Sequence, residues 1–311
     1  MRIAIVGSGG VGGYFGGRLA VAGSDVAFVA RGAHLEALQT RGLTIESAEG
    51  NLHVHRVTAT DDPKTIGTVD AVLFAVKLYD AEAAVQLLPP LIGRETVVVP
   101  LQNGVDSIDL VAPVVGREHV AGGVAYVAAV ISEPGVIRHT AMSRLIFGEL
   151  DGRKSPRLDR LLEACQAGGF DATVSERIEV DIWSKFVRLA VYSGLTSVTR
   201  SPIGPIRDDP DLFAMLQAAC LESMAVARAK GIPLPPRVFD ETMAMTQALP
   251  AQAKSSMLED LERGRPLELP WLSGAIVRIG RELDVDTPIH RFIATVLKPH
   301  VSGHRAVPHV V

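Results

Sequence analysis

The chain has 311 residues, of which 47% are hydrophobic and 21% charged, and its formal net charge is −4. A chain of this length usually folds around more than one hydrophobic core, so two domains are expected. The chain is slightly acidic and has no Lys/Arg block, which argues against nucleic acid or an anionic membrane as its main partner. Two distant cysteines, Cys165 and Cys220, exclude a disulfide framework. Because the N-terminus lacks a signal-peptide pattern and apolar runs are broken before membrane-spanning length, we expect a cytoplasmic protein.

The first 175 residues have the pattern of a doubly wound, mostly parallel sheet. Arg2–Val6 and Asp25–Ala30 are β-branched runs on either side of a helical pattern, which predicts a β-α-β unit. Asp70–Val76 and Glu95–Leu101 are apolar, as in strands buried on both faces. The other elements expected here are a hairpin over 43–57, short antiparallel strands at 121–129, 136–139 and 144–147, a helix at 158–167 and a strand at 171–174. The fold class is Rossmann-like α/β.

From about residue 175 the pattern is helical, with prolines between the helical stretches. Long helices are expected at 179–197, 212–230 and 271–283, and shorter ones at 238–248 and 290–296. We therefore predict a nucleotide-binding domain, 1–175, and an all-helical domain, 176–311, for substrate binding and dimerisation, with a homodimer as one possible state. His300, His304 and His309 lack a metal-ligand context, so a frayed terminus is favoured and no metal site is predicted.

A dinucleotide site is predicted at the N-terminus. Residues 7–12 match G-x-G-x-x-G between a strand and a helix: Gly7, Ser8, Gly9, Gly10, Val11 and Gly12. In this motif the first glycine allows a tight turn, the second the close approach of a pyrophosphate, and the third close packing of helix on strand. The pyrophosphate would lie on the helix N-terminus, where N–H groups and the helix dipole favour an anion.

The end of the second strand indicates which dinucleotide binds. Proteins that bind NAD place an acid there for the ribose 2′-OH, whereas this chain has Arg31 and no acid before Glu36. A guanidinium can hold a 2′-phosphate, and Lys77 after the 70–76 strand adds a second cation. NADP is therefore preferred over NAD, with a solvated loop arginine as the alternative for Arg31.

Two further positions carry candidate chemistry. Asn103 follows a strand at the edge where doubly wound sheets bind ligands, although an Asn-Gly turn alone would also explain it. Lys185 lies on a predicted helix, with Leu189 and Ser193 four and eight residues later on one stripe. A lysine beside an apolar helix face is either a residue that reaches water or a functional amine.

The chain resembles the ketopantoate reductases (2-dehydropantoate 2-reductases) over nearly its whole length. The shared motifs are GSGGVGG, VARG, AVK at Lys77, LQNG at Asn103, W-x-K at 183–185, SSML-x-D-x-x-x-G-R-x-x-E from Ser255 to Glu268, and DTPIH. The resemblance implies NADPH-dependent reduction of a 2-oxo acid, most simply 2-dehydropantoate to pantoate in pantothenate biosynthesis. It also implies that Lys185 is the general acid, that Asn103, Ser256 and Glu268 bind substrate, and that Arg31 and Lys77 hold the cofactor's 2′-phosphate.

We therefore assign Lys185 and Glu268 as catalytic, Asn103, Ser193 and Ser256 as substrate-binding, and residues 7–12, Arg31, Lys77 and Asn103 as cofactor-binding. Simpler explanations stand beside these: Ser256 as a helix N-cap with Glu259, Glu268 as a surface carboxylate, and Asp260 as a solvated helix residue or an ion-pair partner.

One departure from the family concerns substrate identity. The family usually has asparagines where this chain has Leu189 and Ser193, and a site loses selectivity when a group that pairs with the substrate is replaced. A different, more apolar 2-oxo acid is thus a second hypothesis, with Arg188 or Tyr192 as possible substitutes for the amides. A non-catalytic NADPH-sensing protein is the third.

Overall fold

The computed structural model describes residues 1–303, which divide into two compact units. Unit 1 contains residues 1–102 and 106–181, and unit 2 contains residues 103–105 and the chain from Ile182 onward. The expected domain boundary after residue 175 falls shortly before the point at which unit 2 resumes, inside helix α6 (Ile178–Thr199). Three residues of unit 2, Asn103–Val105, thus lie between two stretches of unit 1 in the sequence.

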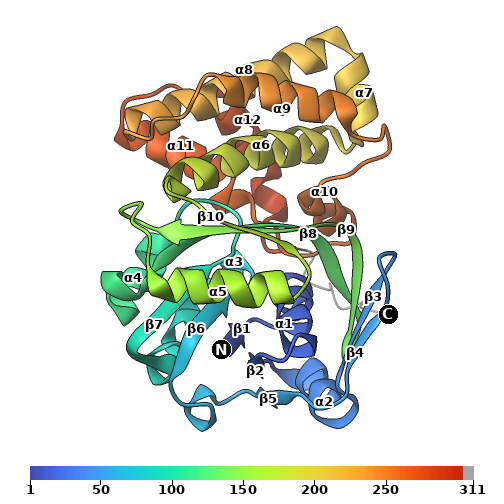
Figure 1. The fold of residues 1–311 in the computed structure, drawn as a ribbon. Coiled ribbons are helices and arrows are strands. Elements are labelled where there is room, and N and C mark those ends of the chain that lie inside the picture. Colours follow the sequence, from blue (N-terminus) through green and yellow to red (C-terminus); the bar gives the residue numbers. More distant parts are fainter. Residues whose placement is uncertain (304–311) are drawn as a thin grey trace. The chain divides into compact units, whose positions relative to one another are not determined.

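Unit 1 is built on a five-stranded parallel sheet, in the order β5-β2-β1-β6-β7 (Figure 1). The strands are β1 (Arg2–Val6), β2 (Asp25–Val29), β5 (Thr58–Thr60), β6 (Val69–Phe74) and β7 (Ile92–Pro100). Along β1 the side chains alternate between two hydrophobic clusters, with Ile3 and Ile5 in one and Ala4 and Val6 in the other. A strand buried on both faces has to be apolar throughout, as this one is.

Helices cover both faces of this sheet. Residues of α1 (Gly10–Val21), α2 (Gly32–Arg41) and α5 (Pro156–Ala167) belong to the cluster of Ile3 and Ile5. Residues of α3 (Leu78–Ala84) and α4 (Ser107–Val115) belong to the cluster of Ala4 and Val6. The predicted doubly wound sheet is confirmed.

A second sheet in unit 1 differs from the expectation. The three short strands expected between residues 121 and 147 are two long ones, β8 (Ala121–Glu133) and β9 (Val136–Glu149), which pair antiparallel. The register shifts near Val127 and Ala128 interrupt the alternation without ending the ladder, so the sequence pattern resembled separate strands. The other strands here are β3 (Leu43–Ser47), β4 (Leu52–Val54) and β10 (Asp171–Val174). The 43–57 hairpin is present and joins this sheet, with β3 parallel to β9.

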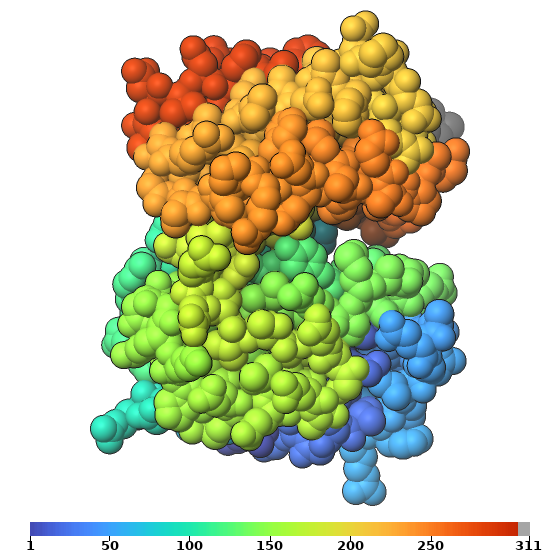
Figure 2. Space-filling model, turned by 45° about the horizontal axis from the view of Figure 1, so that its top comes forward, coloured from blue at the N-terminus to red at the C-terminus, as the bar shows by residue number. Residues whose placement is uncertain are grey.

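The strands and helices of unit 1 are formed by segments far apart in sequence. Helix α1 packs on β8 and β9, and α5 packs on β10 and β7. Figure 2 shows the same arrangement on the surface, where blue N-terminal segments adjoin green segments from later in the chain. Helix α1, which begins in the glycine-rich segment after β1, is therefore packed against strands from later in unit 1.

Unit 2 is helical, as predicted. Besides α6 it contains α7 (Ile203–Asp208), α8 (Pro210–Ala229), α9 (Arg237–Ala248), α10 (Ser256–Glu262), α11 (Ser273–Glu282) and α12 (Pro288–Leu297). Helix α8 reaches the length and hydropathy of a membrane-spanning helix, so the expectation that every apolar run is too short was wrong. Only 39% of its apolar window is buried, but it packs against α11 and α12, as a core helix of a folded domain also does.

An enclosed ion pair stabilises unit 1. The Glu149 carboxylate accepts hydrogen bonds from Arg157 Nε (2.8 Å) and Nη2 (2.7 Å) and from Ser155 Oγ, and the Glu149 side chain is only 4% exposed. Burial alone would raise the pKa of Glu149, but the hydrogen bonds from Arg157 and Ser155 outweigh it and hold the pKa below its usual value.

Arg157→Ala is expected to lower the free energy of unfolding by about 3–5 kcal/mol, because it leaves a buried carboxylate without its cation. Arg138→Ala is the matched control, since Arg138 pairs with Glu46 at an exposed site and should change the free energy by less than about 1 kcal/mol. Urea unfolding of both variants measures the difference. Similar losses of unfolding free energy in the two variants would show that burial of the Glu149 pair does not make it more important for stability than an exposed pair.

Candidate active site

Three predicted site residues form a hydrogen-bonded chain in unit 2. Lys185 Nζ, on α6, donates to Asn103 Oδ1 at 3.0 Å, and Asn103 Nδ2 donates to Glu268 Oε2 at 3.0 Å. Asn103 is held in the loop after β7 by Gly104, whose φ of +94° few other residues adopt. Glu268 precedes the turn at Leu269–Trp271 and is 5% exposed, so the alternative of a surface carboxylate was wrong.

The electrostatics of this group suit proton donation. Burial lowers the pKa of Lys185 to about 8, because desolvation penalises the ammonium, and the charge of Glu268 opposes this shift only in part. The amine is also hydrogen-bonded to Asn103, so it is not a solvated surface lysine. A lysine with such a pKa can both hold and release a proton near neutral pH.

The rest of the α6 stripe has little polar surface to offer, as Leu189 and Ser193 in the sequence indicated. Leu189, one turn after Lys185, is half-buried, and Ser193 is fully buried with its Oγ unpartnered in the protein. Arg188 Nη2 donates to Glu241 Oε2 at 2.6 Å, so that its guanidinium is committed to α9. Burial and the charge of Glu259 raise the pKa of Tyr192 to about 12, which keeps this phenol neutral.

The helix cap in the SSML block is Ser255 and not Ser256. The Ser255 hydroxyl accepts from the Leu258 N–H at 3.1 Å and contacts Thr196 Oγ1 at 2.7 Å. Ser256 is the first residue of α10 and is exposed, so the N-cap explanation for it was wrong. Asp260 is half-buried, with Arg265 Nη1 at 4.0 Å from its carboxylate.

The glycine-rich loop of unit 1 has a shape that fits a pyrophosphate. Gly7 has φ +96°, and a Cβ on Gly12 would lie 2.2 Å from the Gly7 carbonyl oxygen. A Cβ on Gly9 would meet no atom within 4 Å, so this side of the loop is open. Gly9 is also the N-cap of α1, which has no capping side chain and no acid in its first turn. The first turn of α1 therefore presents N–H groups to an anion.

His34 fixes the carbonyl of this loop. The Gly135 N–H donates to His34 Nδ1 at 3.1 Å, which leaves the hydrogen on Nε2 to be donated to the Ser8 carbonyl oxygen at 2.8 Å. Burial lowers the pKa of His34 and so favours the neutral ring that this arrangement requires. Ser8 Oγ donates to the Val29 carbonyl oxygen and ties the loop to β2. His34 was not among the predicted site residues, because nothing in its spacing connects it to Ser8.

The predicted phosphate-binding cations lie at the ends of β2 and β6. Arg31 Nη2 forms an ion pair with Asp80 Oδ2 at 2.7 Å, and the Arg31 side chain is 81% exposed. Lys77 is the N-cap residue of α3, which also carries Asp80 in its first turn. Arg31 is therefore accessible to a ligand and is already oriented by a carboxylate.

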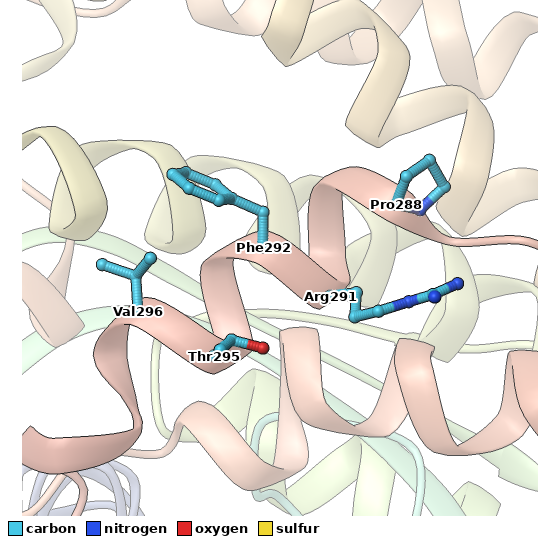
Figure 3. Close-up of a pocket in the computed structure, with 5 residues that line it drawn as sticks. All are labelled: Pro288, Arg291, Phe292, Thr295 and Val296. Carbon is cyan, nitrogen blue, oxygen red and sulfur yellow. The ribbon is translucent and has the colours of Figure 1, made fainter.

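Two features lie apart from these groups. A hollow on the outer side of α12 is lined by Pro288, Arg291, Phe292, Thr295 and Val296, which all come from one helix (Figure 3). It contains none of the predicted site residues. Within residues 1–303, no group of three His, Cys, Asp or Glu side chains is placed to hold a metal ion, and His304 and His309 lie outside the described residues.

Comparison with known proteins gives one consistent result. Residues 3–152 match the family described as ketopantoate reductase PanE/ApbA, and residues 177–301 match the C-terminal part of the same family. The chain is 33% identical to the 2-dehydropantoate 2-reductase of Mesorhizobium japonicum, over 93% of this chain and 94% of the relative.

Solved structures agree with the sequence comparison. The PanE/ApbA family ketopantoate reductase from Ralstonia eutropha JMP134 is 32% identical, with a TM-score of 0.88 over 96% of this chain and 98% of the other. The 2-dehydropantoate 2-reductase from Geobacter metallireducens GS-15 is 30% identical, with a TM-score of 0.90 over 96% of this chain and 99% of the other.

Proposed function

The chain belongs to the ketopantoate reductase family of oxidoreductases, and from this premise we propose that it reduces 2-dehydropantoate to pantoate with NADPH, the reductive step of pantothenate biosynthesis. The observation that carries the proposal is the chain Lys185–Asn103–Glu268, in which burial poises an ammonium for proton transfer. A nicotinamide cofactor supplies the hydride when it is bound.

Lys185 supplies the proton in this proposal. Hydride addition to the carbonyl carbon of a 2-oxo acid leaves negative charge on the carbonyl oxygen, and Lys185 Nζ–H donates to that oxygen to complete the alcohol. The ammonium also stabilises the charge as it develops, and a positioned acid typically contributes about 10²–10⁴-fold to the rate. Solvent then returns a proton to the neutral amine.

Asn103 and Glu268 position this acid. The Asn103 carbonyl oxygen orients the ammonium, and its N–H group is oriented in turn by Glu268. The buried Glu268 carboxylate carries two acceptor oxygens, and in this proposal it also receives a substrate hydroxyl. Exposed Ser256 is the proposed additional substrate-binding residue, and Ser193, which is fully buried, is a weaker candidate than the sequence suggested.

The cofactor preference is proposed to be NADPH over NADH. The open side of Gly9 and the uncapped start of α1 fit the pyrophosphate, and Arg31 with Lys77 would hold the 2′-phosphate. The described end of β2 carries no acid for a ribose 2′-OH, although Asp80 contacts Arg31.

A second candidate function keeps the reaction and changes the acid. Leu189 offers an apolar, half-buried side chain one turn from the proton donor, which favours a 2-oxo acid whose own side chain is apolar.

A cytoplasmic location and a homodimer remain predictions. For the homodimer, Phe292 and Val296 on α12 are candidate interface residues, since they are 48% and 45% exposed.

We expect kcat/KM for reduction to fall as the pH rises above about 8, because Lys185 must be protonated to act as an acid and its pKa is about 8. Lys185→Arg keeps the positive charge, but the guanidinium does not release its proton near neutral pH. The variant should therefore lose about 10²–10⁴-fold in kcat, and its kcat/KM should not fall above about pH 8 as that of the wild type does. Initial rates across the pH range test this, with NADPH affinity as the control. Wild-type protein that binds NADPH but reduces no oxo acid would instead favour a sensing role.

Arg31→Ala should weaken NADPH binding more than tenfold and NADH binding less than about twofold, because only NADPH carries the phosphate that a charge-assisted hydrogen bond would hold. Asp80→Asn is the complementary variant. It releases Arg31 from its ion pair and removes a negative charge, so NADPH should bind more tightly. Equilibrium titration gives both affinities, and equal losses for the two cofactors in Arg31→Ala would refute the phosphate assignment.

Leu189→Asn is expected to change substrate selectivity by about tenfold in favour of a hydroxylated acid, through one added hydrogen bond. The measurement is the ratio of kcat/KM for 2-dehydropantoate to that for 3,3-dimethyl-2-oxobutanoate, which lacks only the hydroxyl. If the wild type already strongly prefers 2-dehydropantoate and the variant does not increase this preference, Leu189 does not determine specificity.

A further inference from the structure

Gln102 has an unusual side chain among the described residues. Both ends of its amide, Oε1 and Nε2, are buried and have no hydrogen-bond partner in the protein. The other buried, unpartnered side-chain atoms in residues 1–303 are single ones, in Ser107, Arg188, Ser193 and Ser197. A buried amide without partners is costly, and such a group in a native protein calls for an explanation, of which a functional role is one.

The sheet register defines where Gln102 lies in unit 1. Val6, at the end of β1, is level with Phe74 of β6, and Phe74 is level with Pro100 of β7. The hydrogen bond from the Leu101 N–H to the Phe74 carbonyl oxygen extends this ladder to the residue before Gln102. Gln102 therefore follows a strand at the same carboxyl edge as the glycine-rich loop. It is two strand spacings, roughly 10 Å, along the sheet from Gly7.

The two halves of a dinucleotide must extend in opposite directions from that loop. Arg31 follows β2, which neighbours β1 on one side, and β6 and β7 lie on the other. If Arg31 marks the adenosine half, the nicotinamide half extends towards the ends of β6 and β7. We propose that Gln102 binds the nicotinamide carboxamide of the cofactor.

The chemistry of the two groups is complementary. Gln102 offers an acceptor and an N–H donor in one plane, and a carboxamide offers the matching donor and acceptor in one plane. A ribose hydroxyl donates and accepts at a single oxygen and cannot complete both ends in this way. The neighbouring Asn103 amide already has partners at both ends, Lys185 and Glu268, so the two consecutive amides of LQNG have separate tasks. This inference rests on the nicotinamide-dependent activity proposed above and is independent of which oxo acid is reduced.

The test is binding by Gln102→Met, which keeps the length of the side chain and removes its hydrogen bonds. NADPH is compared with 2′,5′-ADP, which has the adenosine half and the 2′-phosphate but no nicotinamide. We expect the Kd for NADPH to rise about threefold to tenfold and the Kd for 2′,5′-ADP to stay unchanged. Without ligand, the midpoint of thermal unfolding should stay the same or rise, since an uncompensated buried amide has been removed.

Ser107→Ala is the matched control, because Ser107 Oγ is also buried and unpartnered in the segment after β7. It should leave both dissociation constants unchanged. An equal rise for NADPH and 2′,5′-ADP, an equal effect of Ser107→Ala, or an unchanged NADPH affinity in Gln102→Met would each overturn the proposal. A wild type that does not bind NADPH would instead refute the proposed function.

A cofactor analogue tests the same contact without any change to the protein. The reduced 3-acetylpyridine analogue of NADPH replaces the amide nitrogen with a methyl group and so removes the donor to Gln102 Oε1. The wild type should bind it more weakly than NADPH, and Gln102→Met should bind the two with similar affinity. Equal binding of both by the wild type would place the carboxamide elsewhere.

Discussion

The hydrogen bonds that join the Asn103 side chain to an ammonium and to a carboxylate are the contacts on which the proposed chemistry depends. The charge of Glu268 favours the charged amine, but burial outweighs it and lowers the pKa of Lys185 to about 8. The amide uses its carbonyl for the ammonium and its N–H for the carboxylate, so neither a leucine nor an aspartate could replace it.

The path of the chain explains why this residue is available to unit 2. Asn103–Val105 follow β7 and precede α4, both in unit 1, yet they group with the helical unit. Gly104, with φ +94°, gives the backbone the turn that this excursion needs. The sheet edge thus contributes two consecutive amides, Gln102 in unit 1 and Asn103 in unit 2. A one-residue insertion in LQNG would therefore be more disruptive than one in an ordinary surface loop.

Periodicity and motif spacing were sufficient to predict the parallel sheet and the helical unit, whereas the residues of the hydrogen-bonded chain were singled out by the resemblance to the family. They failed where a tertiary contact determines the outcome. The bulges in β8 and β9 resemble strand ends in sequence, and only the antiparallel pairing of these two strands on both sides of the register shifts shows that they are continuous. Two adjacent serines are equally good caps in sequence, whereas the Thr196 contact accompanies Ser255 as the cap. The contact of His34 with Ser8 spans 26 residues without a motif.

Substrate specificity is constrained by the scarcity of available hydrogen-bonding side chains on α6 after Lys185. Leu189 has no hydrogen-bonding group, Ser193 is fully buried, and Arg188 is committed to Glu241. Because Ser255 serves as the cap of α10, the Ser256 hydroxyl is not consumed by the backbone and is exposed. In the proposed function, polar recognition of substrate in unit 2 would therefore depend on Asn103, Glu268 and Ser256, which lie outside α6. Within α6, proton transfer and apolar contact remain, so the helix would determine the reaction more than the hydroxylation of its substrate.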